Sequence, residues 1–234
     1  EIAERLVDRH EDAYDLSREA QDRYAIESHR RAAAAIEGGD FDREIVPVET
    51  DAGPVERDEG PRPESTIDDL GGLPGAFRED GTVTAANASK LSDGAGVVLL
   101  ADEPAAERLG ADPRAELVDY EVVYRAPDEF NEAVGDVVEA LLDANDLAVD
   151  DVGTFWLNEA FAAQAVYVME RVGIPRDRMN PRGGAIAFGH PIGASGGMIT
   201  AAMAVELHDE ELAYGVSGMS IGGGGAVATL WRRR

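Results

Sequence analysis

Residues 180–196 read NPRGGAIAFGHPIGASG, a stretch in which glycines frame a single histidine, His190. The apolar segment 183–188 precedes this histidine, and Pro191 follows it and fixes the turn. The pattern predicts that the ring of His190 is held between the end of a strand and the start of a helix, a position suited to catalysis. A core histidine satisfied by a backbone carbonyl is the structural alternative.

Strand and helix patterns alternate on both sides of this stretch. Downstream, a small-residue helix is expected over 193–207, and the apolar runs 214–219 and 226–231 predict two strands joined by a glycine bend. Upstream, the periodicity predicts strands over 115–125 and 153–157 and helices over 130–142 and 160–172. Such alternation indicates an α/β fold in which helices cover a sheet.

The first hundred residues are less regular. Residues 1–37 carry apolar side chains at helical spacing, with Ser17 placed to cap the second of two helices and Gly38 and Gly39 placed to end it. A strand is expected over 44–50, an irregular loop over 51–65, a strand over 94–100 and a helix over 104–109.

Two other segments place polar groups where a backbone turn can approach a ligand. Asn158, at a strand-to-helix junction, can donate to a developing oxyanion or simply cap a helix. Ser220 precedes four glycines whose amides, that of Gly222 among them, can form an anion-binding nest or a tight strand connection. His10, His29 and His208 lie in charged helical stretches and are expected to face solvent. The glycine spacing fits neither nucleotide-binding pattern.

Charge and composition narrow the class of protein. The 47 acidic and 21 basic residues give a formal net charge of -26, and Lys90 is the only lysine. This balance predicts a halophilic protein, an ordinary acidic cytosolic protein being the alternative, and it disfavours binding to nucleic acid. No apolar run approaches the roughly 20 residues of a membrane span, so a soluble, cytoplasmic protein is expected. The absence of cysteine excludes thiol catalysis and thiolate metal sites by these residues.

Taken together, these segments resemble the thiolase family. Residues 180–196 resemble the family's histidine signature, 158–161 its Asn-Glu-Ala-Phe motif, and 220–224 lie where its Cys-x-Gly-Gly-Gly motif is found. Residues 58–62, 81–89 and 93–95 resemble its CoA-binding loop domain and the exit from that domain. The resemblance implies a layered αβαβα fold, with part of the loop domain over 1–91, the closing strand and helix of the N-terminal half over 92–111, and the C-terminal βαβαβαββ half over 112–234.

The same resemblance implies an acyl-CoA acyltransferase that condenses two acyl-CoA molecules or cleaves a 3-ketoacyl-CoA by thiolysis. By position, His190 activates the nucleophile and Asn158 orients a water in one oxyanion hole, while the amide of Gly222 serves a second. A further set matches positions that contact CoA or its pantetheine arm: Arg62, Ala85, Ser89 and Phe161. CoA thioesters are substrates in this chemistry, and no cofactor or metal is expected.

Two departures qualify the expected mechanism. The nucleophilic cysteine and the N-terminal half that carries it in the family are expected to be absent, and Ser220 replaces a second cysteine. Because an ordinary thiol has a pKa of about 8.5 and a hydroxyl is far less acidic, Ser220 is expected to share proton transfer with His190.

The departures leave two other classes of function open. One is a non-catalytic or partner-dependent acyl-CoA-binding subunit, and the other is a ketoacyl synthase, in which the Asn-Glu-Ala-Phe segment is harder to explain. Association with the N-terminal thiolase portion and with further subunits is expected, because the helix over 193–207 would otherwise expose apolar surface.

Overall fold

A four-stranded sheet forms the centre of the computed structural model, which describes residues 1–234. The strands lie in the order β3 (Ala115–Tyr124), β6 (Gly225–Arg233), β5 (Tyr214–Ile221) and β4 (Thr154–Leu157). β6 is antiparallel to both of its neighbours, whereas β4 and β5 are parallel. The predicted α/β class and all four of these strands are therefore confirmed, and the ends of β4 and β5 reach the same edge of the sheet.

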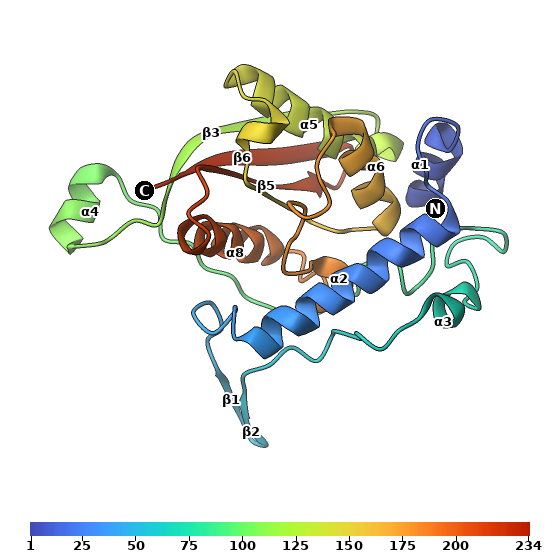
Figure 1. Ribbon diagram of the computed structural model, residues 1–234, viewed down its shortest axis with the longest axis horizontal. Helices are drawn as coiled ribbons and strands as arrows, with labels where there is room; N and C mark the ends of the chain where they lie inside the picture. The colour runs from blue at the N-terminus through green and yellow to red at the C-terminus, as the bar shows by residue number, and fades with distance from the viewer.

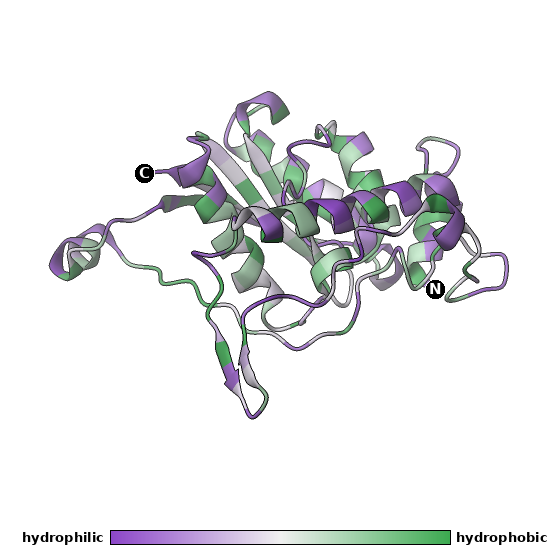
Figure 2. Cartoon of the chain, turned by 60° about the horizontal axis from the view of Figure 1, so that its bottom comes forward, coloured by the Kyte–Doolittle hydropathy of each residue, from purple (hydrophilic) through white to green (hydrophobic).

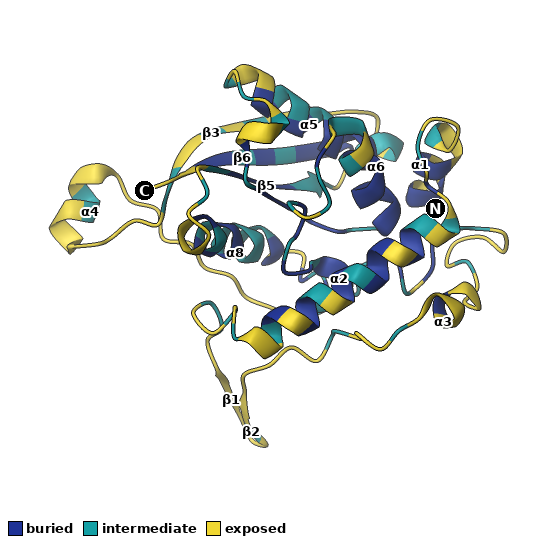
Figure 3. Cartoon of the chain, viewed as in Figure 1, coloured by how far each residue is buried: buried dark blue, intermediate teal, exposed yellow.

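Helices cover both faces of this sheet (Figure 1). α5 (Phe130–Ala144) packs on β3, β5 and β6 and against α6 (Ala162–Val172), whereas α8 (Ser195–Asp209) packs on β4 and β5 from the other face. Burial is deepest in β4, β5 and β6 and in the sides of α5 and α6 that face the sheet, whereas no residue of the edge strand β3 is fully buried (Figure 3). The helix predicted from small residues is thus confirmed as α8, with a contact face that allows close approach to the strands.

The N-terminal helices pack beside α6. α1 (Ile2–His10) is followed by α2 (Arg18–Gly38), which Ser17 caps by accepting from the Ala20 amide at 3.2 Å and which Gly39 ends with a φ of 77°. Both signals were predicted, and both follow from the usual chemistry of helix ends. The short helices are α3 (Ile67–Gly71), α4 (Glu103–Leu109), α7 (Ala185–Phe188), η1 (Pro127–Glu129) and η2 (Val149–Asp151). None of the helices combines the length and the apolar character that a membrane span requires.

The strand predicted over 44–50 is shorter than expected. Only β1 (Val48–Thr50) pairs, and its partner β2 (Gly53–Val55) lies in the region predicted to be an irregular loop. The resulting hairpin projects away from the body of the protein (Figure 1) and both strands are largely exposed. With no core beneath it, the alternating Ile-Val pattern has nothing to pack against and extends the pairing no further.

The strand predicted over 94–100 is not formed. No backbone hydrogen bond involves these residues, and Val97 and Leu99 are 88% and 82% exposed. The segment forms a hydrophobic stretch between the body and α4 (Figure 2). A strand requires a neighbouring strand for its backbone groups, and none of the 234 residues supplies one here.

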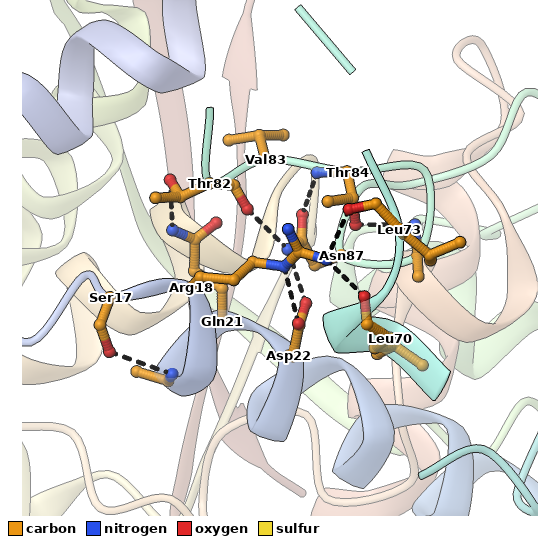
Figure 4. Close-up of polar contacts among 12 residues, drawn as sticks. Ser17, Arg18, Gln21, Asp22, Leu70, Leu73, Thr82, Val83, Thr84 and Asn87 are labelled. Atoms are coloured by element: carbon orange, nitrogen blue, oxygen red, sulfur yellow. Dashed lines mark hydrogen bonds and ion pairs between the residues drawn. The ribbon is translucent and has the colours of Figure 1, made fainter. Parts of the chain in front are cut away.

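A polar network fixes the segment that leads toward the candidate site (Figure 4). Asn87 donates to Asp22 at 2.9 Å and to the carbonyl of Thr82 at 3.0 Å, and it accepts from the Thr84 amide at 2.8 Å. Asp22 also pairs with Arg18 at 2.7 Å. Because Asn87 and Asp22 are buried, these contacts hold residues 82–87 firmly against α2.

Candidate active site

Asn158 directly follows β4 and lies at the edge of the sheet. Its backbone amide donates to the carbonyl of Gly218 on β5 at 3.0 Å, and the residue is almost fully buried. It does not cap the next helix, because α6 begins only at Ala162 with Phe161 in the capping position. The structure thus excludes helix capping as the role of Asn158. The buried residue, with its side-chain amide, lies at the end of β4.

Ser220 lies near the end of the adjacent parallel strand, β5. It is half-buried, pairs with Ala226 across the β5–β6 hairpin, and makes no side-chain hydrogen bond. The glycines after it form the predicted connection: Gly222 is exposed, and Gly223 and Gly224 have φ values of 96° and 102°. Only glycine readily adopts such φ values, so the hairpin turn itself requires Gly223 and Gly224. This requirement holds whether or not the backbone amides bind a ligand.

His190 follows a short helix rather than the expected strand. Residues 185–188 form α7, whose first turn is fixed because the Ile186 amide donates to Glu159 at 3.2 Å. The His190 amide then donates to the carbonyl of Lys90 at 2.8 Å, so the histidine is anchored to the segment after Ser89. The ring is half-buried, and burial lowers the pKa of His190 from its ordinary value of 6.5.

Ser195, at the start of α8, contacts the ring of His190. Its Oγ lies 2.6 Å from Nδ1 and 3.3 Å from the carbonyl oxygen of Pro191. One hydroxyl has one hydrogen, so both contacts are hydrogen bonds only if Ser195 donates to Pro191 and accepts from Nδ1–H. In that arrangement Nε2 keeps its lone pair and can accept a proton.

We expect replacement of Ser195 by alanine to remove this preference for the tautomer protonated on Nδ1. Histidine side-chain ¹⁵N spectra distinguish the two ring nitrogens, and the chain has only four histidines, so His190 can be assigned with a His190→Ala sample. Ser195→Thr keeps the hydroxyl and serves as the control. Identical tautomer populations in Ser195→Ala and the native protein would contradict this role for Ser195.

Ser89, one of the predicted CoA contacts, lies beside Phe161. Ala88 and Phe161 form an antiparallel bridge, and the Ser89 amide donates to the carbonyl of Ala160 at 3.0 Å. The rings of Phe77 and Phe161 meet edge to face at 6.2 Å. Ala85 is exposed on the loop that the Asn87 network holds in place. Ser89 and Phe161 thus lie on adjacent backbone segments, and their contact with CoA stays a prediction.

Arg62 lies on a separate exposed loop that packs on α7. Its amide donates to Nδ1 of His29 at 3.2 Å, and a Cβ on Gly60 would lie only 2.2 Å from the carbonyl oxygen of Ala187. The expectation that His29 faces solvent is wrong, because the residue is only 6% exposed. Burial, with Lys90 and Arg62 close by, lowers the pKa of His29 to about 4 and keeps its ring neutral as an acceptor.

The other two peripheral histidines differ from each other. His208 is exposed beside Asp209, as predicted. His10 is only partly exposed, with Nε2 3.5 Å from the buried carboxylate of Glu132, because α1 packs against the start of α5.

Sequence reasoning gave no role to Glu159, which is fully buried between Asn158 and Ala160. Its two oxygens accept from four donors on three other segments: Tyr24 Oη and Ser28 Oγ at 2.8 Å, Asn180 Nδ2 at 3.0 Å and the Ile186 amide at 3.2 Å. A carboxylate two residues after the apolar strand TFWL was the signal that a buried polar centre lies here.

Backbone contacts place the segments of His190, Asn158 and Ser220 at one end of the sheet. Their side chains do not all contact one another. No hydrogen bond links the His190 ring to Asn158 or Ser220, and a cleft of about 400 Å³ opens beside His190, between residues 92–96 and 191–194. No group of three or more potential metal ligands is present. The arrangement offers a half-buried base, next in sequence to the cleft-lining Pro191, and a buried strand-end residue, Asn158, which does not line the cleft.

Comparison with known proteins identifies the family. The model described as "Thiolase, N-terminal domain" matches residues 3–104, and the model described as "Thiolase, C-terminal domain" matches residues 111–233. The expectation that the N-terminal portion is absent is not supported, since both domain models match.

Two relatives show the extent of the similarity. A probable acetyl-CoA acyltransferase of Staphylococcus epidermidis is 41% identical over 97% of this chain and 58% of its own length. A 3-ketoacyl-CoA thiolase of Bacillus subtilis is 40% identical over 93% of this chain and 59% of its own length. The chain therefore spans slightly less than three fifths of the relatives it matches.

Solved structures agree with the sequence comparison. The human mitochondrial 3-ketoacyl-CoA thiolase in complex with CoA superposes with a TM-score of 0.95 at 36% identity, covering 100% of this chain and 58% of that one. The Bacillus anthracis acetyl-CoA acetyltransferase gives 0.93 at 37% identity, covering 100% of this chain and 59% of the other. The expected thiolase fold is confirmed, and the chain belongs to the thiolase family.

Proposed function

We propose that this chain carries the acyl-CoA-binding and proton-transfer part of a thiolase, which condenses two acyl-CoA molecules or cleaves a 3-ketoacyl-CoA by thiolysis. The observation that carries the proposal is the convergence of three segments: Ala88 bridges Phe161, Leu91 bridges His190, and Asn158 binds Gly218. Predicted CoA contacts and predicted catalytic groups, far apart in sequence, thus adjoin each other.

In this proposal His190 is the base that removes the proton from the attacking group. Its lowered pKa favours the neutral ring, and the contact with Ser195 favours a free lone pair on Nε2. Asn158 and the Gly222 amide supply hydrogen bonds to the oxygens that become negative during acyl transfer. Arg62, Ala85, Ser89 and Phe161 bind CoA or its pantetheine arm, with CoA thioesters as substrates and no further cofactor.

Ser220 and the lack of cysteine shape the rest of the proposal. The chain has no thiol, so the cysteine that accepts the acyl group in this family lies outside these 234 residues. Ser220 is a poor base by itself, and His190 takes the larger share of proton transfer at the substrate's α-carbon. The same two features favour a second candidate, an acyl-CoA-binding subunit that depends on a partner for chemistry.

The experiment that tests the proposal combines CoA titration with denaturing intact mass after incubation with acetoacetyl-CoA. The 234 residues, with a mass of 24.9 kDa, are expected to bind CoA and to gain no acetyl group. A thiolase preparation that also contains the cysteine-bearing region should gain one acetyl group and cleave acetoacetyl-CoA. CoA binding without turnover in any such preparation would favour the binding subunit, and absence of CoA binding would overturn both candidates.

The net charge of -26 with one lysine supports a halophilic source. The exposed apolar stretch over 94–100 supports association with further thiolase polypeptide in an oligomer, and we propose that this assembly works in the cytoplasm.

A further inference from the structure

The end of β4, which leads to Asn158, is paired differently on its two sides. On one side, the backbone amide of Asn158 donates to the carbonyl of Gly218 on β5 at 3.0 Å. On the other side, β4 is the edge strand, and its backbone pairing stops at Phe155, whose carbonyl accepts from the Asn180 amide at 2.9 Å. Leu157, the residue before Asn158, therefore has no backbone partner on this side.

The side chain of Asn180 supplies the missing partner. Its Oδ1 accepts from the Leu157 amide at 3.0 Å, and its Nδ2 donates to the Leu157 carbonyl at 2.8 Å. A side-chain amide offers a donor and an acceptor, as a peptide group does, so Asn180 extends the edge of the sheet by one residue. The second hydrogen of Nδ2 goes to the buried Glu159 at 3.0 Å, which fixes which end of the Asn180 amide is the donor.

Asn180 makes these contacts from an uncommon backbone conformation. Its φ is 44°, in the left-handed region that few residues other than glycine adopt, asparagine being among those that tolerate it. Pro181 follows, and the residue before a proline usually keeps an extended backbone. Asn180 is also 1% exposed. Such a conformation persists where surrounding contacts hold it, so the contacts with Leu157 and Glu159 fix the residue in place.

The side chain of Asn158 has no comparable support of its own. It makes no hydrogen bond to another residue of the chain, although the residue is only 5% exposed. The direction of its amide group is therefore set by the backbone at the end of β4. Because a donor stabilises a developing charge best when it is fixed before the reaction, whatever fixes this backbone bears on the chemistry.

We propose that Asn180 is a positioning residue for Asn158. By binding both backbone groups of Leu157, it fixes the strand end that presents the Asn158 amide to the reacting oxygen. This inference rests on the proposed function and extends it to a residue to which the motif comparison gave no role. Asn180 is also the first residue of the stretch 180–196, which carries His190. One side chain therefore links the segment of the base to the segment of the oxyanion donor.

Asn180→Gly is the test substitution, because glycine adopts a φ of 44° without strain and the change removes only the side chain. The measurement uses a thiolase preparation that also contains the cysteine-bearing region. We expect kcat for acetoacetyl-CoA cleavage to fall about tenfold, since a small misplacement of a catalytic group has an effect of this size or larger. KM should stay nearly unchanged, because Asn180 is not among the predicted CoA contacts.

A double-mutant cycle with Asn158→Ala separates positioning from general damage. If Asn180 acts through Asn158, Asn180→Gly lowers kcat in the native background and leaves kcat nearly unchanged in the Asn158→Ala background. The same fractional loss of kcat in both backgrounds would show that Asn180 does not act through Asn158, and it would overturn the proposal. Unchanged kcat in Asn180→Gly would overturn it as well.

Two further variants complete the design. Asp146→Gly is the matched control, because Asp146 also has a positive φ, 52°, but is exposed just after α5, and its kcat should be native. Asn180→Asp keeps the volume and the acceptor for the Leu157 amide but loses both donors. It replaces Asn180→Gly in the cycle if the glycine variant does not fold, and the same coupling with Asn158 is expected.

The cycle also distinguishes failure of this inference from failure of the proposed function. A native preparation without thiolase activity would overturn the proposed function and, with it, the role of Asn180. Native activity without coupling between Asn180 and Asn158 would overturn only the role of Asn180.

Discussion

Replacement of Glu159 by alanine is expected to lower the free energy of unfolding by about 3–5 kcal/mol. The carboxylate is fully buried, and its removal leaves Tyr24 Oη, Ser28 Oγ, Asn180 Nδ2 and the Ile186 amide without an acceptor. It also leaves a cavity where α2, α7 and the end of β4 meet. Urea unfolding at constant KCl, followed by far-UV circular dichroism, measures the loss.

Glu159→Gln is the matched variant because it keeps the volume and changes only the hydrogen-bonding pattern. The amide oxygen can accept two hydrogens, and the Ser28 hydroxyl can turn to accept from the new NH₂ group, but the Ile186 amide cannot. We expect a smaller loss of about 1–2 kcal/mol. If Glu159→Ala and Glu159→Gln unfolded at the same urea concentration as the native protein, the carboxylate would not be the anchor of this region.

In a thiolase preparation that also contains the cysteine-bearing region, replacement of His190 by alanine is expected to lower kcat/KM about 10²–10⁴-fold, because proton transfer loses its base. CoA affinity should change little, since the ring is not among the predicted CoA contacts. Burial lowers the pKa of His190, so its neutral form persists as the pH falls past 6.5. The native activity should accordingly be retained just below pH 6.5 and decline only at lower pH, which a pH profile of kcat/KM measures.

His208→Ala provides the control for this substitution. His208 lies on the exposed end of α8, and the alanine variant should retain native kcat/KM. Native turnover in His190→Ala would refute its role as the base. A loss of equal size in both variants would point to damage of α8 instead.

The sequence predicted best those elements whose signals are local. Ser17 caps α2 and Gly39 ends it, because both act on the backbone within one turn. The strands of the central sheet were also predicted, since their apolar side chains pack on α5 and α8. The stretch over 94–100 has an equally apolar sequence but lacks a pairing partner, so periodicity alone predicted a strand that does not form.

The candidate site was predicted in part, for a related reason. His190, Asn158 and Ser220 occupy glycine-rich or strand-end positions that local pattern reveals. The short helix α7 was missed because the acceptor that fixes it, Glu159, lies 27 residues away in sequence. Burial of His29 was missed because it depends on a loop that returns more than 30 residues later. Both features result from long-range packing.

The unpaired stretch over 94–100 also limits the solution conditions that suit the molecule. Its free backbone groups and exposed Val97 and Leu99 can add to the edge of another sheet, and the charge of -26 opposes such an encounter. Concentrated salt shortens the range of that repulsion, and salts excluded from the protein surface strengthen apolar contact. Salt that relieves repulsion within the chain therefore removes a barrier between chains, and colloidal stability passes through an optimum in ionic strength.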